Sequence, residues 1–303
     1  MLKNGIAFTK MQALGNDFVY IDAVSQNIPD PVTLAQQMSN RHFGIGSDGL
    51  VLICPSNTAD FRMRIFNHDG SEAEMCGNAI RSLAKFVYHY GLTTRREMKI
   101  ETIAGLKTLY LEVTGDEVTN ITAEIGYPVF AAEKVPVVTD EPTFIGQPVM
   151  LADRMFTTTA ISLGNPFSAS YIDDVFGLDL AKYGPLMENH EIYPKKINAV
   201  FCEIIDRNNI RLRTWERNTG ETLACGLGCC TSVVAGTLLG LCSPSADIEQ
   251  LGGFTHIEWE NGKDRLFMTG PSEIVFEGIW RVSGNETGQA SKANRVQGSS
   301  GRA

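Results

Sequence analysis

The sequence lacks a long hydrophobic run and an excess of basic residues. No stretch of about 18 consecutive apolar residues, the length that crosses a bilayer, occurs in the 303 residues. The start of the chain also lacks the apolar segment and cleavage site of a secretory signal. Acidic residues outnumber basic ones by 35 to 26, whereas a nucleic-acid surface needs a face rich in Lys and Arg. We therefore expect a cytoplasmic protein without membrane or nucleic-acid partners.

Paired cysteines and metal-binding motifs are also missing. Seven cysteines form an odd set in a chain without a secretion signal, so a disulfide framework is not expected. Cys225, Cys229 and Cys230 lie close together, but they lack the second Cys or His pair of a structural zinc site. We expect free thiols and no metal.

No cofactor signature fits its required context. The run Gly44-Ile-Gly-Ser-Asp-Gly49 has the glycine spacing of dinucleotide-binding loops, but it leads into a strand-like segment instead of opening a helix. We interpret it as a turn that passes close to a ligand or another backbone segment. No feature indicates pyridoxal phosphate, so the sequence predicts no cofactor.

The chain does contain an internal repeat. A gapless offset of 149 residues aligns three short blocks, 14–18 with 163–167, 62–67 with 211–216, and 76–77 with 225–226. Asn16 and Cys76 are therefore separated by 60 residues, as are Asn165 and Cys225. We interpret the matches as a duplicated domain in which each copy supplies one cysteine.

Each half is predicted to be rich in strands around one helix. Residues 50–54, 61–66 and 211–215 have the apolar or alternating patterns of strands. A helix is predicted after each cysteine, over residues 77–89 and 228–241, and the second carries no charge. The expected fold class is α+β, with two pseudo-symmetric halves, each a strand layer wrapped around a central helix, and the active site in the cleft between them.

Length and composition allow two domains. The chain is long enough for two cores, and 43% of its residues are hydrophobic. We assign residues 1–124 and 270–280 to an N-terminal half and residues 125–269 to a C-terminal half. Residues 281–303 contain few apolar side chains and are expected to form a disordered tail.

The two Cys-Gly pairs are suited to acid/base chemistry. A helix N-terminus favours a thiolate by roughly one pKa unit, and Gly77 and Gly226 would let a ligand approach the first N–H groups. When two thiols face each other, one thiolate raises the pKa of its partner, which leaves a base and an acid. Inversion of a Cα centre needs such a pair on opposite faces of the carbon. There are two alternatives. One is that duplication kept two buried core cysteines without a catalytic role. The other is a thiol redox protein in which Cys76 and Cys225 form a disulfide.

Several motifs resemble the diaminopimelate epimerase family, from about Phe8 to Trp280. The motifs are Leu14-Gly-Asn-Asp-Phe18, Arg41-His-Phe-Gly-Ile-Gly-Ser-Asp-Gly49, Arg64-Ile-Phe-Asn-His-Asp-Gly-Ser-Glu72, Met75-Cys-Gly-Asn78, Leu163-Gly-Asn-Pro166, Asn198 and Trp215-Glu-Arg-Asn-Thr-Gly-Glu-Thr-Leu-Ala-Cys-Gly226. The resemblance implies two halves that close over an amino-acid substrate, with Cys76 and Cys225 as the catalytic pair and no cofactor or metal. It implies interconversion of L,L- and meso-diaminopimelate, in lysine and peptidoglycan precursor biosynthesis, and a homodimer.

The resemblance also implies which residues bind the two ends of the substrate. The reacting end would be bound by Asn16, Asn78 and the backbone of Gly77, Gly226 and Leu227. The distant end would be bound by Asn67, Asn165, Asn198, Glu216 and Arg217. An arginine binds a carboxylate through two parallel hydrogen bonds, while Asn and Glu oxygens accept from an ammonium group.

Three positions depart from the usual family pattern. Phe167 stands where the family usually has histidine, Asn218 where it has glycine, and Leu227 where it has a small hydroxyl residue. These departures favour, as an alternative, a racemase or epimerase of the same fold that acts on another amino acid.

Overall fold

The computed structural model describes residues 5–281 and is built mainly of strands. Its helices are α1 (Pro31–Ser39), α2 (Gly77–His89), α3 (Leu180–Glu188), α4 (Gly226–Leu238) and the 3-10 turn η1 (Glu260–Gly262). Its strands are β1 (Gly5–Ala13), β2 (Asn16–Asp22), β3 (Gly49–Cys54), β4 (Phe61–Asn67), β5 (Glu72–Ala73), β6 (Glu97–Thr102), β7 (Gly105–Thr114), β8 (Glu117–Gly126), β9 (Phe144–Leu151), β10 (Arg154–Ser162), β11 (Pro166–Tyr171), β12 (Asn198–Asp206), β13 (Asn209–Glu216), β14 (Gly220–Thr222), β15 (Ser245–Gln250), β16 (Gly253–Trp259), β17 (Leu266–Gly270) and β18 (Glu273–Arg281). The fold is α+β, as expected.

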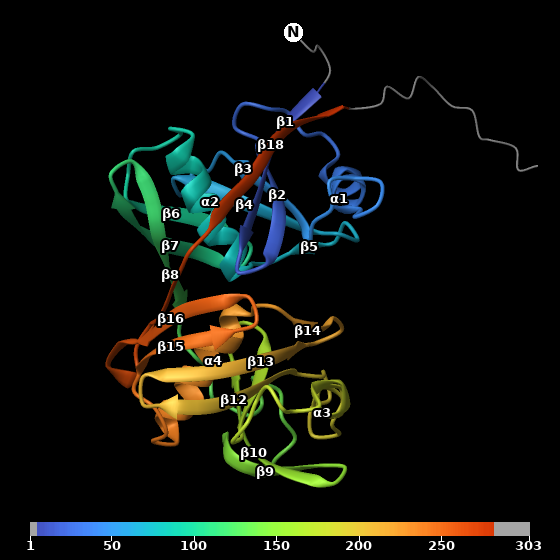
Figure 1. Ribbon diagram of the computed structural model, residues 1–303, viewed down its shortest axis with the longest axis vertical. Coiled ribbons are helices and arrows are strands. Elements are labelled where there is room, and N and C mark those ends of the chain that lie inside the picture. Colours follow the sequence, from blue (N-terminus) through green and yellow to red (C-terminus); the bar gives the residue numbers. More distant parts are fainter. Residues whose placement is uncertain (1–4, 282–303) are drawn as a thin grey trace, which may run out of the picture.

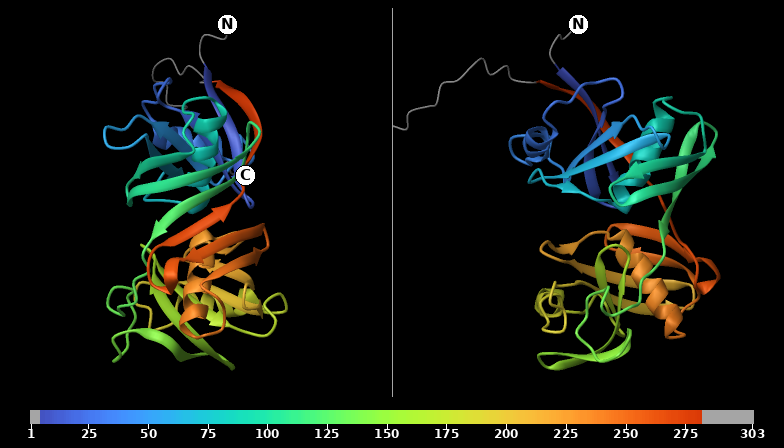
Figure 2. Two further views of the ribbon diagram at one scale, coloured as in Figure 1. Left: turned by 90° about the vertical axis from the view of Figure 1, so that its left-hand side faces the viewer. Right: turned by 180° about the vertical axis from the view of Figure 1, so that it is seen from behind.

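The elements are arranged in two lobes (Figure 1). The first contains β1 to β8 with α1 and α2, and the second contains β9 to β17 with α3 and α4. The chain enters the second lobe after β8, and β18 returns to the first lobe, where it pairs antiparallel with β1. Figure 2 shows that both crossings lie on the same side of the molecule. Because β8 also pairs antiparallel with β17, the strands of both lobes form one mixed sheet.

The same order of elements occurs in both lobes. The bounds of α3 and α4 follow those of α1 and α2 at the offset of 149 residues seen in the sequence. Parallel pairing recurs at equivalent places, β2 with β3 and β11 with β12, then β4 with β6 and β13 with β15. The equivalence extends to the helix caps, since Asp30 accepts from the N–H of Thr33 and Asp179 from that of Lys182.

The helices α2 and α4 lie at the centres of the lobes. Helix α2 packs against β1, β2, β3, β7 and β8, and α4 packs against strands β10 to β13 and β15 to β17. One apolar cluster includes Leu83 and Val87 of α2, Val233 and Val234 of α4, and Met268 between them. The absence of charged residues in α4 therefore agrees with its burial.

The predicted elements agree with the structure in position, and their bounds differ slightly. The helix over residues 77–89 is confirmed with the same bounds, and the predicted strands correspond to β3, β4 and β13. The second helix begins at Gly226 and ends at Leu238, instead of spanning 228–241. It ends early because Gly240 has a φ of 71°, a left-handed conformation that terminates helices.

The glycine-rich run before β3 is a turn, as predicted. A Cβ on Gly44 would lie 2.1 Å from the carbonyl oxygen of Gln37, and Gly46 has a φ of 80°. The predicted tail was to start at residue 281, but Arg281 belongs to β18, and residues 282–303 lie outside the described part. Within residues 5–281, the helices are too short or too polar to cross a bilayer.

Candidate active site

Cys76 and Cys225 occupy equivalent positions at the N-termini of the two central helices. Each is the N-cap residue, with φ and ψ of −138° and 122° at Cys76 and −132° and 102° at Cys225. Both thiols are free. Neither thiol accepts a capping hydrogen bond from the first turn, but the N–H groups of Asn78 and Ala79 lower the pKa of Cys76, and that of Gly228 lowers the pKa of Cys225. The positive ends of two helices are therefore directed at the two thiols.

The N-termini of α2 and α4 meet on either side of Met268. A Cβ on Gly77 would lie 2.6 Å from Met268 Cε, and one on Gly226 would lie 2.5 Å from Met268 Sδ. Neither glycine can therefore be replaced without displacing Met268. Met268 occupies the space beside the Cα atoms of these glycines, and the predicted approach of a ligand to their N–H groups stays a prediction.

Asn16 connects Cys76 to a group of charged residues. The thiol of Cys76 donates to Asn16 Oδ1 over 3.4 Å, and Asn16 Nδ2 donates to Asp48 Oδ2 over 2.7 Å. Arg41 donates to both Asp48 and Asp17, over 2.9 and 2.8 Å. These bonds fix the orientation of the Asn16 amide, so that its oxygen faces Cys76.

Glu216 lies against Cys225 at the end of β13. The hydroxyl of Thr222 donates to Glu216 Oε1 over 2.8 Å, and the Cys225 thiol lies close enough to the carboxyl group to affect its pKa. Burial raises the pKa of Glu216, while the hydrogen bond from Thr222 and the nearby Cys225 thiol act in the opposite direction. The negative charge of Glu216 also acts on Cys76, so this carboxylate lies within electrostatic reach of both cysteines.

The pKa of each thiol lies above its ordinary value in the substrate-free protein. Burial raises the pKa of Cys76, and the N–H groups of Ala79 and Asn78 only partly oppose it. Burial raises the pKa of Cys225 further, with the charge of Glu216 acting in the same direction. The first-turn N–H groups lower the pKa of each thiol, in the expected direction, but the net shift is upward because desolvation of the thiolate outweighs them.

The segment that carries Arg217 is held by buried hydrogen bonds. Asn198 donates to the carbonyl of Pro166 over 2.8 Å and accepts from the N–H of Arg217 over 2.9 Å. Arg217 Nη1 donates to the carbonyl of Lys195 over 3.1 Å. Asn198 therefore connects β11, β12 and the end of β13, and it fixes the backbone at Arg217.

Glu188, at the end of α3, supports the same segment and was missed by the sequence analysis. Its carboxylate accepts from Trp215 Nε1 over 2.8 Å, from the N–H of Asn218 over 3.0 Å and from Lys196 Nζ over 3.0 Å. Burial raises the pKa of Glu188, but these bonds outweigh it and leave the pKa below the usual value. No motif marks Glu188, because its partners come from two other segments, the turn at Lys196 and residues 215–218.

Asn165 and Asn67 differ in how they are bonded. The side-chain oxygen of Asn165 is buried and has no hydrogen-bond partner within the described residues. Asn16, at the equivalent turn, accepts from Cys76. Asn67 Nδ2 donates to Ser71 Oγ over 2.9 Å, within its own turn. The structure thus brings together Cys76, Cys225, Asn16, Asn78, Glu216 and the two glycines. The side chains of Asn67 and Arg217 bond to residues outside this group, Ser71 and Lys195.

The three positions that depart from the usual family pattern lie in different structural settings. Phe167 is buried in the apolar cluster that surrounds the central helices. Asn218 has a φ of 62°, which is the left-handed conformation that glycine adopts most readily. Leu227 is half-buried in the first turn of α4, and its carbonyl accepts from Thr231 Oγ1 over 2.8 Å.

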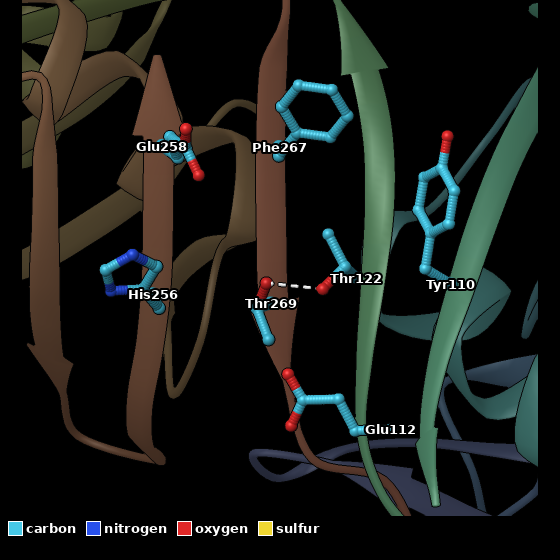
Figure 3. A pocket seen from close by; sticks show the side chains of 7 residues that line it. All are labelled: Tyr110, Glu112, Thr122, His256, Glu258, Phe267 and Thr269. Carbon is cyan, nitrogen blue, oxygen red and sulfur yellow. Dashed lines mark hydrogen bonds between the residues drawn. The ribbon is translucent and has the colours of Figure 1, made fainter. Parts of the chain in front are cut away.

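A pocket on the outer surface is separate from this site. It lies where β7 and β8 meet β16 and β17 (Figure 3), and its lining includes none of the predicted site residues. The lining residues are Tyr110, Glu112, Thr122, His256, Glu258, Phe267 and Thr269. Over residues 5–281, no three His, Cys, Asp or Glu side chains are grouped as a metal site would require.

Solved structures share this fold at low sequence identity. A hydroxyproline epimerase from Agrobacterium vitis matches with a TM-score of 0.65 and 13% identity, covering 94% of this chain and 93% of its own. A Bacillus anthracis phenazine biosynthesis protein of the PhzF family matches with a TM-score of 0.64 and 17% identity, covering 92% and 99%. The chain therefore shares its fold with both of these proteins.

Curated relatives match along most of the chain. A diaminopimelate epimerase of Methanococcus maripaludis (strain C6) is 47% identical over 271 residues, which is 89% of this chain and 98% of the relative. That of Acetivibrio thermocellus is 46% identical, with coverages of 89% and 97%. The family model for diaminopimelate epimerase matches residues 8–131 and 159–275. The chain therefore belongs to the diaminopimelate epimerase family.

Proposed function

We propose that the protein is an amino-acid epimerase that interconverts L,L- and meso-diaminopimelate, with Cys76 and Cys225 as the acid/base pair. The observation that carries the proposal is the equivalent placement of two free cysteines at the N-termini of two central helices, in a chain of this family. The activity would serve lysine and peptidoglycan precursor biosynthesis. A cytoplasmic location, a homodimer and a reaction without cofactor or metal stay predictions.

The reaction needs one thiolate and one thiol on opposite faces of the α-carbon. The thiolate takes the α-proton, the electron pair of the C–H bond moves into the carboxylate, and the opposite thiol returns a proton to the carbon. Negative charge therefore grows on the carboxylate, which the N–H groups at the two helix ends would stabilise. Gly77, Asn78, Gly226 and Leu227 supply these groups, and Asn16 lies beside Cys76.

Cys76 is the first thiol to ionise in this scheme. Burial, and next the charge of the Glu216 carboxylate, raise the pKa of Cys225 well above its ordinary value, so a thiolate is least stable there. At Cys76 the effect of Glu216 is smaller than that of the two first-turn N–H groups, and the charge of Arg81 also favours the thiolate. The starting state is then a Cys76 thiolate and a Cys225 thiol.

Polar groups beyond the cysteines would bind the distant end of the substrate. The unpartnered oxygen of Asn165 and the carboxylate of Glu216 would accept from the distal ammonium group. Arg217 would bind the distal carboxylate once its side chain leaves the Lys195 carbonyl. Asn67 and Asn198 would complete this end. A substrate without a second amino-acid centre would leave these groups unpaired.

A same-fold epimerase of another amino acid is the second candidate. Phe167 and Leu227 favour it, because an apolar side chain stands at each position where the family usually has a polar one. The hydroxyproline epimerase of similar fold supports the general possibility of other substrates. A panel of amino acids distinguishes the two candidates.

We also propose that the fold arose by duplication and divides at residue 124. The recurrence of α1 and α2 as α3 and α4, at one offset, supports the duplication. The pairing of β18 with β1 supports assigning residues 270–280 to the N-terminal half and residues 125–269 to the C-terminal half.

Solvent-deuterium incorporation tests the proposed activity. L,L-diaminopimelate is incubated in D₂O under reducing conditions with wild type, Cys76→Ala, Cys225→Ala and the control Cys54→Ala. Wild type and the control should exchange the α-proton and epimerise, whereas both catalytic variants should lose roughly 10²- to 10⁴-fold in epimerisation. If only a different amino acid exchanges its α-proton, diaminopimelate is not the substrate. If no amino acid exchanges its α-proton, the redox alternative is favoured.

A further inference from the structure

Arg81 is a fully buried cation beneath the N-terminus of α2. Its relative exposure is 0%, and it lies one helical turn after Gly77. Nη1 donates to the Gly77 carbonyl over 3.2 Å and to Met268 Sδ over 3.3 Å, and Nη2 donates to Asn78 Oδ1 over 2.8 Å. Gly270 makes room for the guanidinium, because a Cβ there would lie 3.3 Å from Nη2.

This guanidinium has no carboxylate partner among residues 5–281. Its three partners are neutral, and its Nε is buried without any partner. The titratable groups that face it are the thiols of Cys76, Cys229 and Cys230 and the hydroxyl of Tyr20. A buried cation without a counter-ion is costly, and its place near two positive helix ends increases the cost. Local stability therefore gives no reason for a positive charge at this position.

Arg81 also determines how Asn78 is oriented. Because Asn78 Oδ1 accepts from Arg81, the NH₂ group of the amide is the part left to donate elsewhere. Asn78 is 4% exposed and lies between the helix ends, since a Cβ on Gly226 would lie 3.8 Å from Asn78 Oδ1. Two N–H donors are thus held where the proposed reaction places the substrate carboxylate.

We propose that Arg81 is a positioning residue whose missing counter-ion is the negative charge of the reaction. It orients Asn78 as a donor to the substrate carboxylate, and its charge favours the Cys76 thiolate and the carboxylate charge that grows when the α-proton leaves. The role in turnover rests on the proposed function. The effect on Cys76 can be measured without substrate.

Three variants separate charge, hydrogen bond and packing. Arg81→Met removes the charge and the donors while keeping an apolar chain of similar length. Arg81→Gln keeps an amide donor for Asn78 without the charge, and Arg81→Lys keeps the charge. Besides Arg81, the charged or titratable groups that face Cys76 are Glu216 of β13 and Tyr20 of β2, and all variants leave these unchanged.

The experiment combines three measurements on the full chain. These are kcat/KM for L,L-diaminopimelate, the midpoint of urea unfolding, and the pH dependence of Cys76 alkylation by iodoacetamide, followed by mass spectrometry. Arg81→Met should lose roughly 100-fold in kcat/KM while its unfolding midpoint stays equal or rises. In Arg81→Met and Arg81→Gln, Cys76 should be alkylated roughly tenfold more slowly below its pKa. Arg81→Lys should recover much of both losses.

A purely structural role would give a different result. Activity and unfolding midpoint would then fall together in Arg81→Met, and Cys76 of Arg81→Gln would be alkylated at the wild-type rate. Either result overturns the inference. If wild type exchanges no α-proton of diaminopimelate, the proposed function fails, while the alkylation profiles still decide whether Arg81 acts on Cys76. If Arg81→Met does not fold, the comparison of Arg81→Gln with Arg81→Lys decides the same question.

Discussion

The carbonyl oxygen of Leu14 lies 2.0 Å from the position that a Cβ on Gly252 would occupy. Leu14 belongs to the β1–β2 turn of the first lobe and Gly252 to the β15–β16 turn of the second. A Cβ on Gly15 would similarly lie 2.8 Å from Leu223 Cδ1. At the equivalent turn of the second lobe, the Cβ position of Gly164 has no neighbour within 4 Å. The lobes are therefore in close contact at the β1–β2 turn and open at the β10–β11 turn.

Gly252→Ala should separate the lobes at this contact. The new Cβ cannot coexist with a carbonyl oxygen at 2.0 Å, so one backbone segment must move. Because a misplacement of about 1 Å between catalytic groups costs on the order of 100-fold, we expect a loss of that size in kcat/KM. Steady-state kinetics and small-angle scattering check this, with an increased radius of gyration expected.

Gly115→Ala is the control for Gly252→Ala. Gly115 is in the β7–β8 turn, its Cβ position is open, and its φ of 62° makes alanine there cost about 1–2 kcal/mol of stability. This variant should lose stability and keep its activity. Equal kcat/KM in wild type and Gly252→Ala would show that the contact at Leu14 does not position the cysteines.

Much of the fold was predictable because it follows local patterns. The helix over residues 77–89 is marked by apolar spacing after Cys76, and the structure has the same bounds. Helices α1 and α3 were missed, although Asp30-Pro31 is a standard N-cap and N1 pair. Each of these helices has nine residues and a weak apolar pattern, so tertiary packing decides whether it forms.

The protonation of the cysteines could not be predicted from local sequence. The N-cap position of Cys76 correctly indicated N–H groups that lower its pKa, but the dominant effect on that pKa is burial, which raises it. The same limitation hid Arg81, which reads as an ordinary charged helix residue until Met268 and Gly270 are placed beside it. Long-range packing determines both properties.

Glu216→Gln should speed the alkylation of both cysteines and slow the turnover of diaminopimelate. The carboxylate raises the pKa of both Cys76 and Cys225, so a neutral amide should lower both values and speed alkylation at a fixed pH near 8. Turnover should fall, because the distal ammonium loses a charged acceptor worth about 1.5–3 kcal/mol, or roughly ten- to hundredfold in kcat/KM. Alkylation rates between pH 7 and 10 and diaminopimelate kinetics measure the two effects.

Glu221→Gln provides the matched control in the same hairpin. Glu221 accepts from Arg213 Nε and Nη2 over 2.7 and 3.0 Å, so the variant removes a carboxylate that is engaged elsewhere. It should leave both alkylation profiles unchanged. Slower alkylation of Cys225 in Glu216→Gln would contradict the assigned sign of the Glu216 charge.

Asn218 should be replaceable by glycine and poorly replaceable by alanine. Its φ of 62° costs a residue with a Cβ about 1–2 kcal/mol, although Asn tolerates this conformation better than most side chains. Its side chain accepts from the half-exposed Lys196 over 3.0 Å, a bond of small expected value. Asn218→Ala should therefore lose roughly 1 kcal/mol in urea unfolding, and Asn218→Gly should stay within about 0.5 kcal/mol of wild type.

The same pair of variants tests whether Asn218 affects substrate choice. The backbone N–H of residue 218, which donates to Glu188, is kept in both variants, so the segment around Arg217 should keep its shape in Asn218→Gly. Its preference among amino acids should then equal that of wild type. If Asn218→Gly loses as much stability as Asn218→Ala, the bond to Lys196 and not the left-handed backbone holds this turn; a changed preference would instead assign the Asn218 side chain a direct part in recognising the substrate.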